Sequence, residues 1–243
     1  MPLHIGIVAC SAEGAALCYR TICDEGPALM GTHRHPEVSM HTHALGEYMD
    51  FIYRDDWQGV ADLMLSSAEK LKRVGADFLI CPDNTIHRSF AAVAERSPLP
   101  WLHIVEEVAA ETRRRGFQRV AITGTRYTME SQIYPEVLER SGIDYRFPSP
   151  IDRGEINRII FDELVNGIFK SESLAVFLAV IEGMKAEGCD AVVLGCTEIP
   201  LIVTPENSPL PVLDSTRLLA RAALKRAVDG PGLAGAARRS SVR

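Results

Sequence analysis

The sequence lacks several features that would assign it to a common functional class. It has no apolar run of the ~18 residues that a membrane-spanning helix needs. The formal net charge is -6 and the pI is about 5.7, so the composition offers no basic face for nucleic acid or for an anionic membrane. The N-terminal MPLHIGIVAC also lacks the basic region and long apolar core of a signal peptide. We therefore expect a cytoplasmic protein with no nucleic-acid and no membrane partner.

The common metal and dinucleotide motifs are also missing. The six cysteines form no CxxC pair, which excludes a zinc ribbon, and a disulfide framework is not expected in an intracellular chain. The turn after the first predicted strand, residues 10–14, reads CSAEG rather than GxGxxG. His41 and His43 would share one face of a strand, but no carboxylate or cysteine lies at a companion spacing. We expect no metal site and no cofactor.

What is present is an alternation of short apolar runs with segments of helical spacing. Hydrophobic residues make up 47% of the chain and charged residues 24%, which suits a protein with a sizeable core. Alternating strands and helices indicate βαβ units and parallel sheets, so the predicted fold class is α/β. We read residues 26–36 as a loop and 45–55 as a connection. The predicted strands are residues 4–9, 38–43, 78–81, 101–104, 119–123, a short one near 145, 191–194 and 212–213.

Two stretches of the chain resemble each other without a gap. GADFLICPDNTIH at residues 75–87 aligns with GCDAVVLGCTEIP at residues 188–200, and Asp83 falls opposite Cys196. Each stretch reads as a buried parallel strand with polar residues at its carboxyl end, where ligands bind in open α/β sheets. The repeat predicts two similar α/β lobes, the first built on residues 1–98 and the second on residues 99–212. Residues 229–243 have no apolar period and read as a disordered tail.

Asp83 and Cys196 are the predicted catalytic pair. A thiol and a carboxyl from opposite lobes suit proton transfer at a carbon, in which one group removes a proton and the other delivers one to the opposite face. A free cysteine titrates near ~8.5 and an aspartate near ~3.9, so Asp83 needs a raised pKa to act as a base. Burial in a closed cleft would raise it. Cys81, two residues earlier, is the alternative thiol on this strand.

Hydroxyl and amide groups near the two strand tips are predicted to bind the substrate. They donate hydrogen bonds to a carboxylate without adding a competing acid. We expect Thr197 to orient the sulfur and Glu198 to accept an ammonium group, while Lys170 is a weaker candidate for a carboxylate contact and His87 orders a helix start. The predicted carboxylate-binding residues are Ser11, Asn84, Thr85, Thr125 and Thr128.

These motifs resemble those of the aspartate/glutamate racemase superfamily. GCTEIP at residues 195–200 matches the second catalytic motif of the family, and Asn84-Thr85-x-His87 matches the first. GTRYTMES at residues 124–131 resembles the hydroxyl-rich loop of the second lobe, and DST at residues 214–216 resembles the motif that opens the last helix. The similarity runs from Ile5 to about Val228, nearly the whole chain.

The resemblance implies two similar α/β lobes, related by a pseudo-two-fold axis, with the active site in the cleft between them. It also implies 1,1-proton transfer on an amino acid without pyridoxal phosphate or metal, and a homodimer. The last helix is implied to return to the first lobe, which would then consist of residues 1–98 plus 213–228. The chain departs from the family where a cysteine usually precedes Asn84, because Asp83 stands there. A racemase of the family with threonine at this position also lacks that cysteine, as this chain does.

The asymmetric pair leaves two other functions open. With a single thiol, the site could decarboxylate a malonate-type acid or isomerise a cis-unsaturated dicarboxylic acid, as relatives in the superfamily do. Alternatively, the replacement by Asp83 could leave a ligand-binding protein without turnover.

Overall fold

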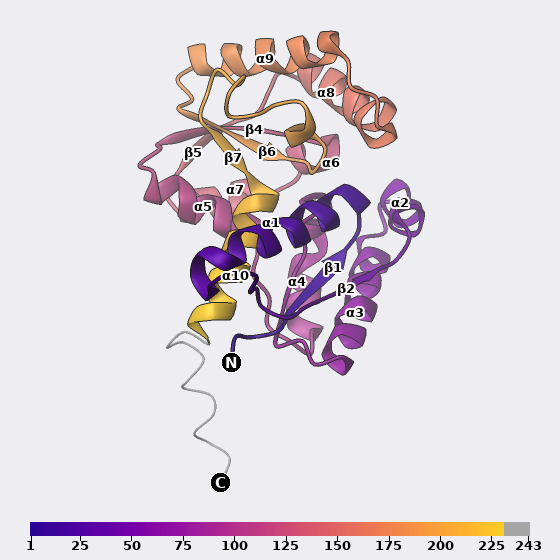
Figure 1. Ribbon diagram of the computed structural model, residues 1–243. Helices are drawn as coiled ribbons and strands as arrows, with labels where there is room; N and C mark the ends of the chain where they lie inside the picture. The colour runs from indigo at the N-terminus through magenta and orange to yellow at the C-terminus, as the bar shows by residue number, and fades with distance from the viewer. Residues whose placement is uncertain (231–243) are drawn as a thin grey trace.

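Two parallel β-sheets organise the computed structural model, which describes residues 1–230 (Figure 1). The first sheet has the order β2-β1-β3 and the second has the order β5-β4-β6-β7. All strand pairs are parallel, which confirms the predicted α/β class with two parallel-sheet lobes. The strands are β1 (Ile5–Ala9), β2 (Val38–Thr42), β3 (Phe78–Ile80), β4 (Arg119–Gly124), β5 (Asp144–Arg146), β6 (Ala191–Gly195) and β7 (Val212–Asp214).

Helices cover both sheets and fill most of the connections between strands (Figure 1). The long helices are α1 (Ala12–Met30), α3 (Trp57–Arg73), α5 (Ile104–Arg114), α8 (Pro150–Asp162), α9 (Ser171–Ala186) and α10 (Ser215–Asp229). The short ones are α2 (Leu45–Tyr53), η1 (Thr85–Ser89), α4 (Phe90–Arg96), α6 (Arg126–Met129), α7 (Ile133–Arg140), η2 (Leu164–Asn166) and η3 (Ile199–Leu201).

Four expectations about local structure were wrong. Helix α1 continues to Met30 through part of the predicted loop, and α2 occupies the segment that we read as a connection. The predicted strand at residues 101–104 is reduced to one bridge between Trp101 and Leu79. Helix α10 extends to Asp229, so the predicted tail begins too early, and its residues 231–243 lie outside the described part of the chain.

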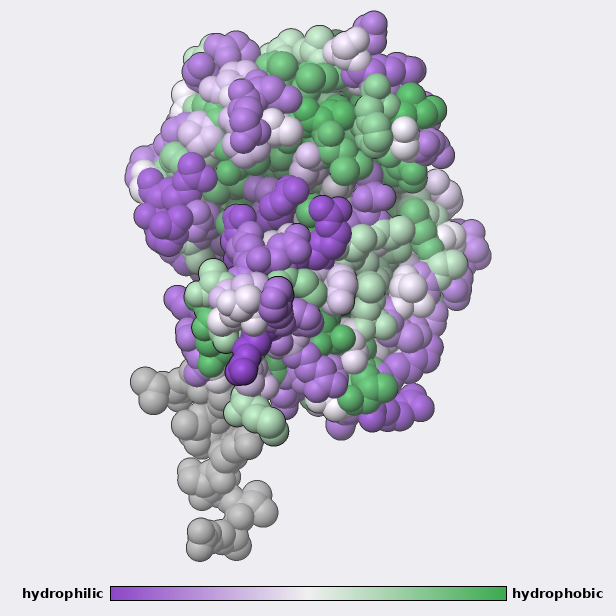
Figure 2. Space-filling view, in the orientation of Figure 1, coloured by the Kyte–Doolittle hydropathy of each residue, from purple (hydrophilic) through white to green (hydrophobic). Residues whose placement is uncertain are grey.

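The core of each sheet is built from strands that are buried along their whole length. Every residue of β1, β3 and β6 is buried. β1 and β6 are central strands, and the outer side of β3 is met by the Trp101 bridge. Figure 2 shows hydrophilic residues over much of the surface that carries α1 and α5 in this view. Within residues 1–230, no helix combines the length and apolarity needed to cross a membrane.

Helix α10 packs against α1 and also against α5, so this helix contacts helices from both halves (Figure 1). The backbone N–H of Leu3 donates to the carbonyl of Ala227 at 2.8 Å, which ties the N-terminus to the same helix. Strand β7 completes the second sheet before α10 begins. The exact bounds of the two lobes stay a prediction.

Candidate active site

The carboxyl ends of β1, β3, β4 and β6 converge on one pocket between the sheets. Asp83 follows β3 by three residues, and Cys196 directly follows β6. Both line this pocket, as do most of the residues predicted from the sequence: Ser11, Asn84, Thr85, Thr125, Thr197 and Glu198. Parallel strands direct their carboxyl ends to the same side of a sheet, so residues far apart in sequence meet there.

Asp83 is held against the start of helix α1. The backbone N–H of Ser11 lies 3.3 Å from each carboxylate oxygen of Asp83. The residue is only 9% exposed, and burial raises the pKa of Asp83 to about 7 against the opposing effect of the Ser11 hydrogen bonds. The nearby Glu198 carboxylate raises it further. Asp83 can therefore gain or lose a proton near neutral pH, as a general acid or base requires.

The Cys196 thiol lies within hydrogen-bonding distance of Glu198. The sulfur Sγ donates to Glu198 Oε2 at 2.9 Å, and the Thr197 hydroxyl donates to the same oxygen at 2.7 Å. Thr197 thus contacts Glu198 rather than the sulfur. Burial, followed by the negative charge of Glu198, raises the pKa of Cys196 well above its usual range. The thiol therefore carries its proton and can deliver it as an acid.

Ser11 links Asp83 to the loop that carries Cys196. Its backbone N–H contacts Asp83, and its hydroxyl lies 3.2 Å from the Thr197 hydroxyl. Its side chain also caps α1 by accepting from the N–H of Gly14. Gly14 must be a glycine for this close approach, because a Cβ there would lie 2.4 Å from Thr197 Cγ2. The start of α1 is thereby seated directly on the Cys196 loop.

Three threonine hydroxyls form a cluster on the other side of the pocket. Thr85 Oγ1 lies 2.9 Å from Thr125 Oγ1 and 3.2 Å from Thr128 Oγ1, and the last two lie 3.2 Å apart. Thr128 is fully buried behind the other two. The cluster joins the loop after β3 to the loop after β4 and offers hydroxyl donors to a carboxylate.

Asn84 is a bridge between the halves rather than an open polar group. Its amide oxygen accepts from the Tyr134 hydroxyl at 2.8 Å, and its amide nitrogen donates to Ser215 Oγ at 2.9 Å. Ser215 in turn donates to the carbonyl of Leu194 in β6. Sequence reasoning gave no site role to Tyr134 or Ser215. The DST motif at residues 214–216 was the available signal, since Thr216 also donates to the Pro82 carbonyl.

His87 and Cys81 support Asp83 from the inside of the first lobe. His87 Nδ1 donates to the Asp83 carbonyl at 2.9 Å, and burial lowers the pKa of His87 to about 4. The ring is therefore neutral near pH 7 and orders the start of η1. Cys81 is fully buried in the apolar core and does not line the pocket, so its sulfur lies away from the predicted substrate position.

The chain matches a family model described as Asp/Glu/Hydantoin racemase over residues 7–223. It is similar to the crystal structure of a candidate Asp/Glu racemase from Yersinia pestis, with 31% identity, a TM-score of 0.86, and coverage of 93% of this chain and 99% of that one. An aspartate racemase homologue from Pyrococcus horikoshii OT3 is 28% identical, with a TM-score of 0.81 and the same coverage.

A curated relative gives a consistent result. The broad specificity amino-acid racemase RacX of Bacillus subtilis is 26% identical over 161 residues, which cover 65% of this chain and 68% of that protein. A glutamate racemase from Persephonella marina is also 26% identical, over 64% of its length. The chain thus spans about two thirds of the length of these curated relatives. The chain belongs to the Asp/Glu/Hydantoin racemase family.

Proposed function

We propose that the protein is a racemase or epimerase that moves a proton at the α-carbon of an amino acid, with Asp83 and Cys196 acting on opposite faces. The observation that carries the proposal is the convergence of these two side chains, from the tips of β3 and β6, on one pocket. Their protonation suits the task at neutral pH. Asp83 has a pKa of about 7, while burial keeps the Cys196 thiol protonated.

One direction of the reaction follows from these protonation states. The Asp83 carboxylate takes the proton from the α-carbon, and the electron pair of that C–H bond remains on the substrate. The Cys196 thiol then delivers its proton to the opposite face, which leaves a thiolate on Cys196 and a neutral Asp83. The opposite enantiomer is processed by the same steps in reverse, starting from the Cys196 thiolate and the neutral Asp83. Alternatively, Asp83 loses its proton to solvent and Cys196 takes one from solvent, which restores the starting state before the next turnover.

The polar residues of the pocket would orient the substrate. We propose that the hydroxyls of Thr85, Thr125 and Ser11 bind the substrate carboxylate, and that the buried Thr128 orients the other two threonines from behind. Hydrogen bonds to the carboxylate stabilise the charge that develops on it when the α-proton leaves. Glu198 Oε1 would accept a hydrogen bond from the substrate ammonium, while Oε2 keeps the hydrogen bond that it accepts from the Cys196 thiol. Asn84 would act from its bridging position by fixing the Asp83 loop.

The same proposal includes features that the family resemblance implies. The reaction would proceed without pyridoxal phosphate and without a metal, since Asp83 and Cys196 supply both the base and the acid. The active form would be a cytoplasmic homodimer of two-lobed subunits. Sedimentation equilibrium of the full chain measures the subunit number directly.

Solvent exchange at the α-carbon tests the function. The protein is incubated in D₂O with a panel of L- and D-amino acids, and loss of the α-proton signal is followed by NMR. We expect exchange with at least one amino acid, and we expect Cys196→Ala to abolish the conversion of that amino acid into its enantiomer. Cys23→Ala is the matched control, because Cys23 is a half-buried thiol in α1 that does not line the pocket. No exchange by a folded wild type across the whole panel would refute the proposal.

The unlike pair also supports a second function. A carboxyl and a single thiol in the pocket suit a one-way reaction, in which a malonate-type acid loses carbon dioxide or a cis-unsaturated diacid is isomerised, with Cys196 as the acting thiol. Carbon dioxide release or double-bond isomerisation without exchange of an α-proton would select this function. Ligand binding that survives Cys196→Ala, with no turnover by the wild type, would indicate a ligand-binding protein.

A further inference from the structure

The pocket has a second wall that is chemically unlike the polar one. Its first part comes from helix α2, where Leu45, Met49 and Ile52 recur with helical spacing and all line the pocket. Residues of α2 such as Glu47 and Asp50 are exposed. The amphipathic helix therefore turns its apolar face to the pocket and its charged face to solvent.

The second half of the molecule completes this wall. Ile160 and Phe161 of α8 line the pocket opposite α2, together with Tyr127 of α6 and Val165 of η2. The Tyr127 and Phe161 rings meet edge to face, with their centroids 6.5 Å apart. We call the seven residues of the two halves the apolar wall: Leu45, Met49, Ile52, Tyr127, Ile160, Phe161 and Val165.

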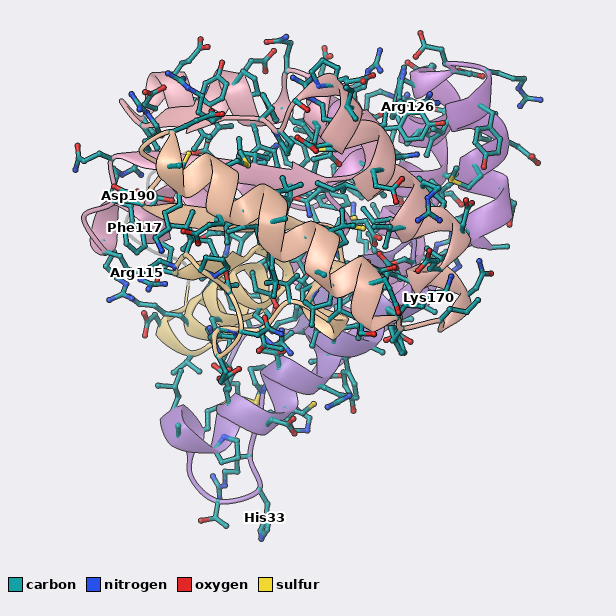
Figure 3. The ribbon with its side chains drawn as sticks, turned by 90° about the horizontal axis from the view of Figure 1, so that it is seen from above. His33, Arg115, Phe117, Arg126, Lys170 and Asp190 are labelled. Atoms are coloured by element: carbon teal, nitrogen blue, oxygen red, sulfur yellow. The ribbon has the colours of Figure 1, made fainter. Side chains whose placement is uncertain are left out.

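Cations are missing from the pocket lining. Among residues 1–230, the charged side chains that line it are Asp83 and Glu198, and no lysine, arginine or histidine does so. Lys170 was the basic residue considered from the sequence as a contact for the substrate carboxylate. It lies at the N-terminal end of α9 (Figure 3). Its Nζ is paired with the buried carboxylate of Glu163 at 3.4 Å. That carboxylate also accepts from Arg158 at 2.9 Å.

Arg126, which neighbours the apolar wall in sequence, makes its contacts outside the pocket lining as well. The Arg126 guanidinium stacks over the Tyr127 ring, 5.1 Å from its centroid, and lies 3.3 Å from the Tyr127 hydroxyl. Arg126 is exposed (Figure 3), and unlike Tyr127 it does not line the pocket. The Arg126 guanidinium thus contacts Tyr127 and adds no positive charge to the pocket lining.

We propose that the substrate of this site is an amino acid with an uncharged, apolar side chain. The proposal rests on the proposed function, because it assigns the α-carboxylate and ammonium to the polar wall. The side chain of a substrate bound in this way is directed to the apolar wall. A second carboxylate, as in aspartate or glutamate, would be buried there without a cation and would add to the negative charge of Asp83 and Glu198.

A binding and exchange panel tests the proposal on the wild-type protein. Affinities for leucine, methionine, phenylalanine, aspartate, glutamate and lysine are measured by calorimetry, and α-proton exchange is measured in D₂O. We expect an apolar amino acid to exceed aspartate and glutamate by at least about 100-fold in affinity or kcat/KM, the scale of an unpaired buried carboxylate. Equal or tighter binding of the acidic amino acids, or no binding of any apolar one, would overturn it.

The two readouts separate this proposal from the one on which it rests. Preferential binding of apolar amino acids without α-proton exchange would refute the racemase function and leave the preference of the pocket intact. If aspartate or glutamate exchanged its α-proton at the highest rate, the racemase function would be supported and the apolar preference of the pocket would be refuted.

Three variants locate the preference in the pocket wall. Met49→Lys adds a cation to the apolar wall, and we expect it to raise the ratio of aspartate to leucine kcat/KM by at least about 10-fold. Met49→Gln is the matched neutral control, of similar length, and should leave aspartate disfavoured. Lys170→Ala should leave the ratio unchanged within about two-fold. An aspartate activity of the wild type that Lys170→Ala removes would assign the cation to Lys170 and contradict the proposal.

Discussion

Asp83→Asn should make the protein more stable at alkaline pH while removing its activity. The pKa of Asp83 is about 7 in the folded protein, against a usual value of 3.8. The unfolded chain therefore loses this proton near pH 4, whereas the folded protein keeps it until about pH 7. Folding is disfavoured by the ionised group as the pH rises through this window, and asparagine cannot ionise.

The size of the effect follows from the difference between the two pKa values. A gap of about 3 pH units, at 1.36 kcal/mol for each, amounts to about 4 kcal/mol. The free energy of unfolding of Asp83→Asn minus that of the wild type should thus rise by about 4 kcal/mol between pH 4 and pH 8. The asparagine oxygen can still accept from the Ser11 N–H, so this contact is kept.

Urea unfolding at several pH values, followed by circular dichroism, measures this difference. Asp24→Asn, at an exposed position of α1, is the control and should change stability by less than about 0.5 kcal/mol at every pH. In the same pH series, α-proton exchange by the wild type should rise with a midpoint near pH 7. A difference between Asp83→Asn and the wild type that does not change with pH would show that Asp83 has the same pKa in the folded and the unfolded chain, and would refute the reasoning.

Three further substitutions test the geometry of the site. Cys196→Ala should lower the rate of conversion between enantiomers at least about 1,000-fold, measured by chiral chromatography, because it removes the acid on one face; a smaller loss would assign the acid elsewhere. Gly14→Ala should lower the free energy of unfolding by about 1–3 kcal/mol in urea, because its Cβ would lie 2.4 Å from Thr197 Cγ2. Gly154→Ala is the control and should be neutral or stabilising, because Gly154 is an exposed position of α8 where an added Cβ would meet no atom within 4 Å. Equal losses of stability in the two variants would contradict the steric reason. Tyr134→Phe should lower stability by about 1–2 kcal/mol in the same assay by removing the hydrogen bond that its hydroxyl donates across the cleft, and an unchanged midpoint would show that the bond contributes nothing.

The parallel-sheet lobes were predictable because their signal is local and repeated. Buried strands such as β3 and β6 are continuous apolar runs, and the polar residues that follow them mark the strand ends. The chain repeats this pattern twice, so Asp83 and Cys196 could be assigned to corresponding positions. Their presence in one pocket follows from parallel topology, which brings strand ends to the same side of each sheet.

Helices α1 and α2 show why other parts could not be predicted. Gly26 and Pro27 favour a loop, yet α1 continues past them, and a Cβ at Gly26 would lie 2.8 Å from the carbonyl oxygen of Arg34. The packing of the returning chain thus overrides local propensity. Helix α2 is only 9 residues long, and its apolar face is stabilised by contacts that the sequence does not specify.

The contacts of Asn84 were equally hidden. An Asn-Thr pair after a strand is typical of a turn, and nothing in its neighbourhood points to Tyr134 or Ser215. These partners are 50 and 131 residues away in the chain. Pairing of this kind depends on how the halves close on each other, which no local pattern encodes.

The threonine cluster has a consequence for how long a substrate stays bound. Thr85, Thr125 and Thr128 bond to one another, so a carboxylate that enters does not gain new hydrogen bonds but exchanges neutral ones for charge-assisted ones. Each exchange is worth only about 1 kcal/mol, the difference between the two kinds of bond. Such a site holds its ligand weakly and regains its own bonds on release. In the proposed racemisation, this reversibility would favour the release of either of the two mirror-image products.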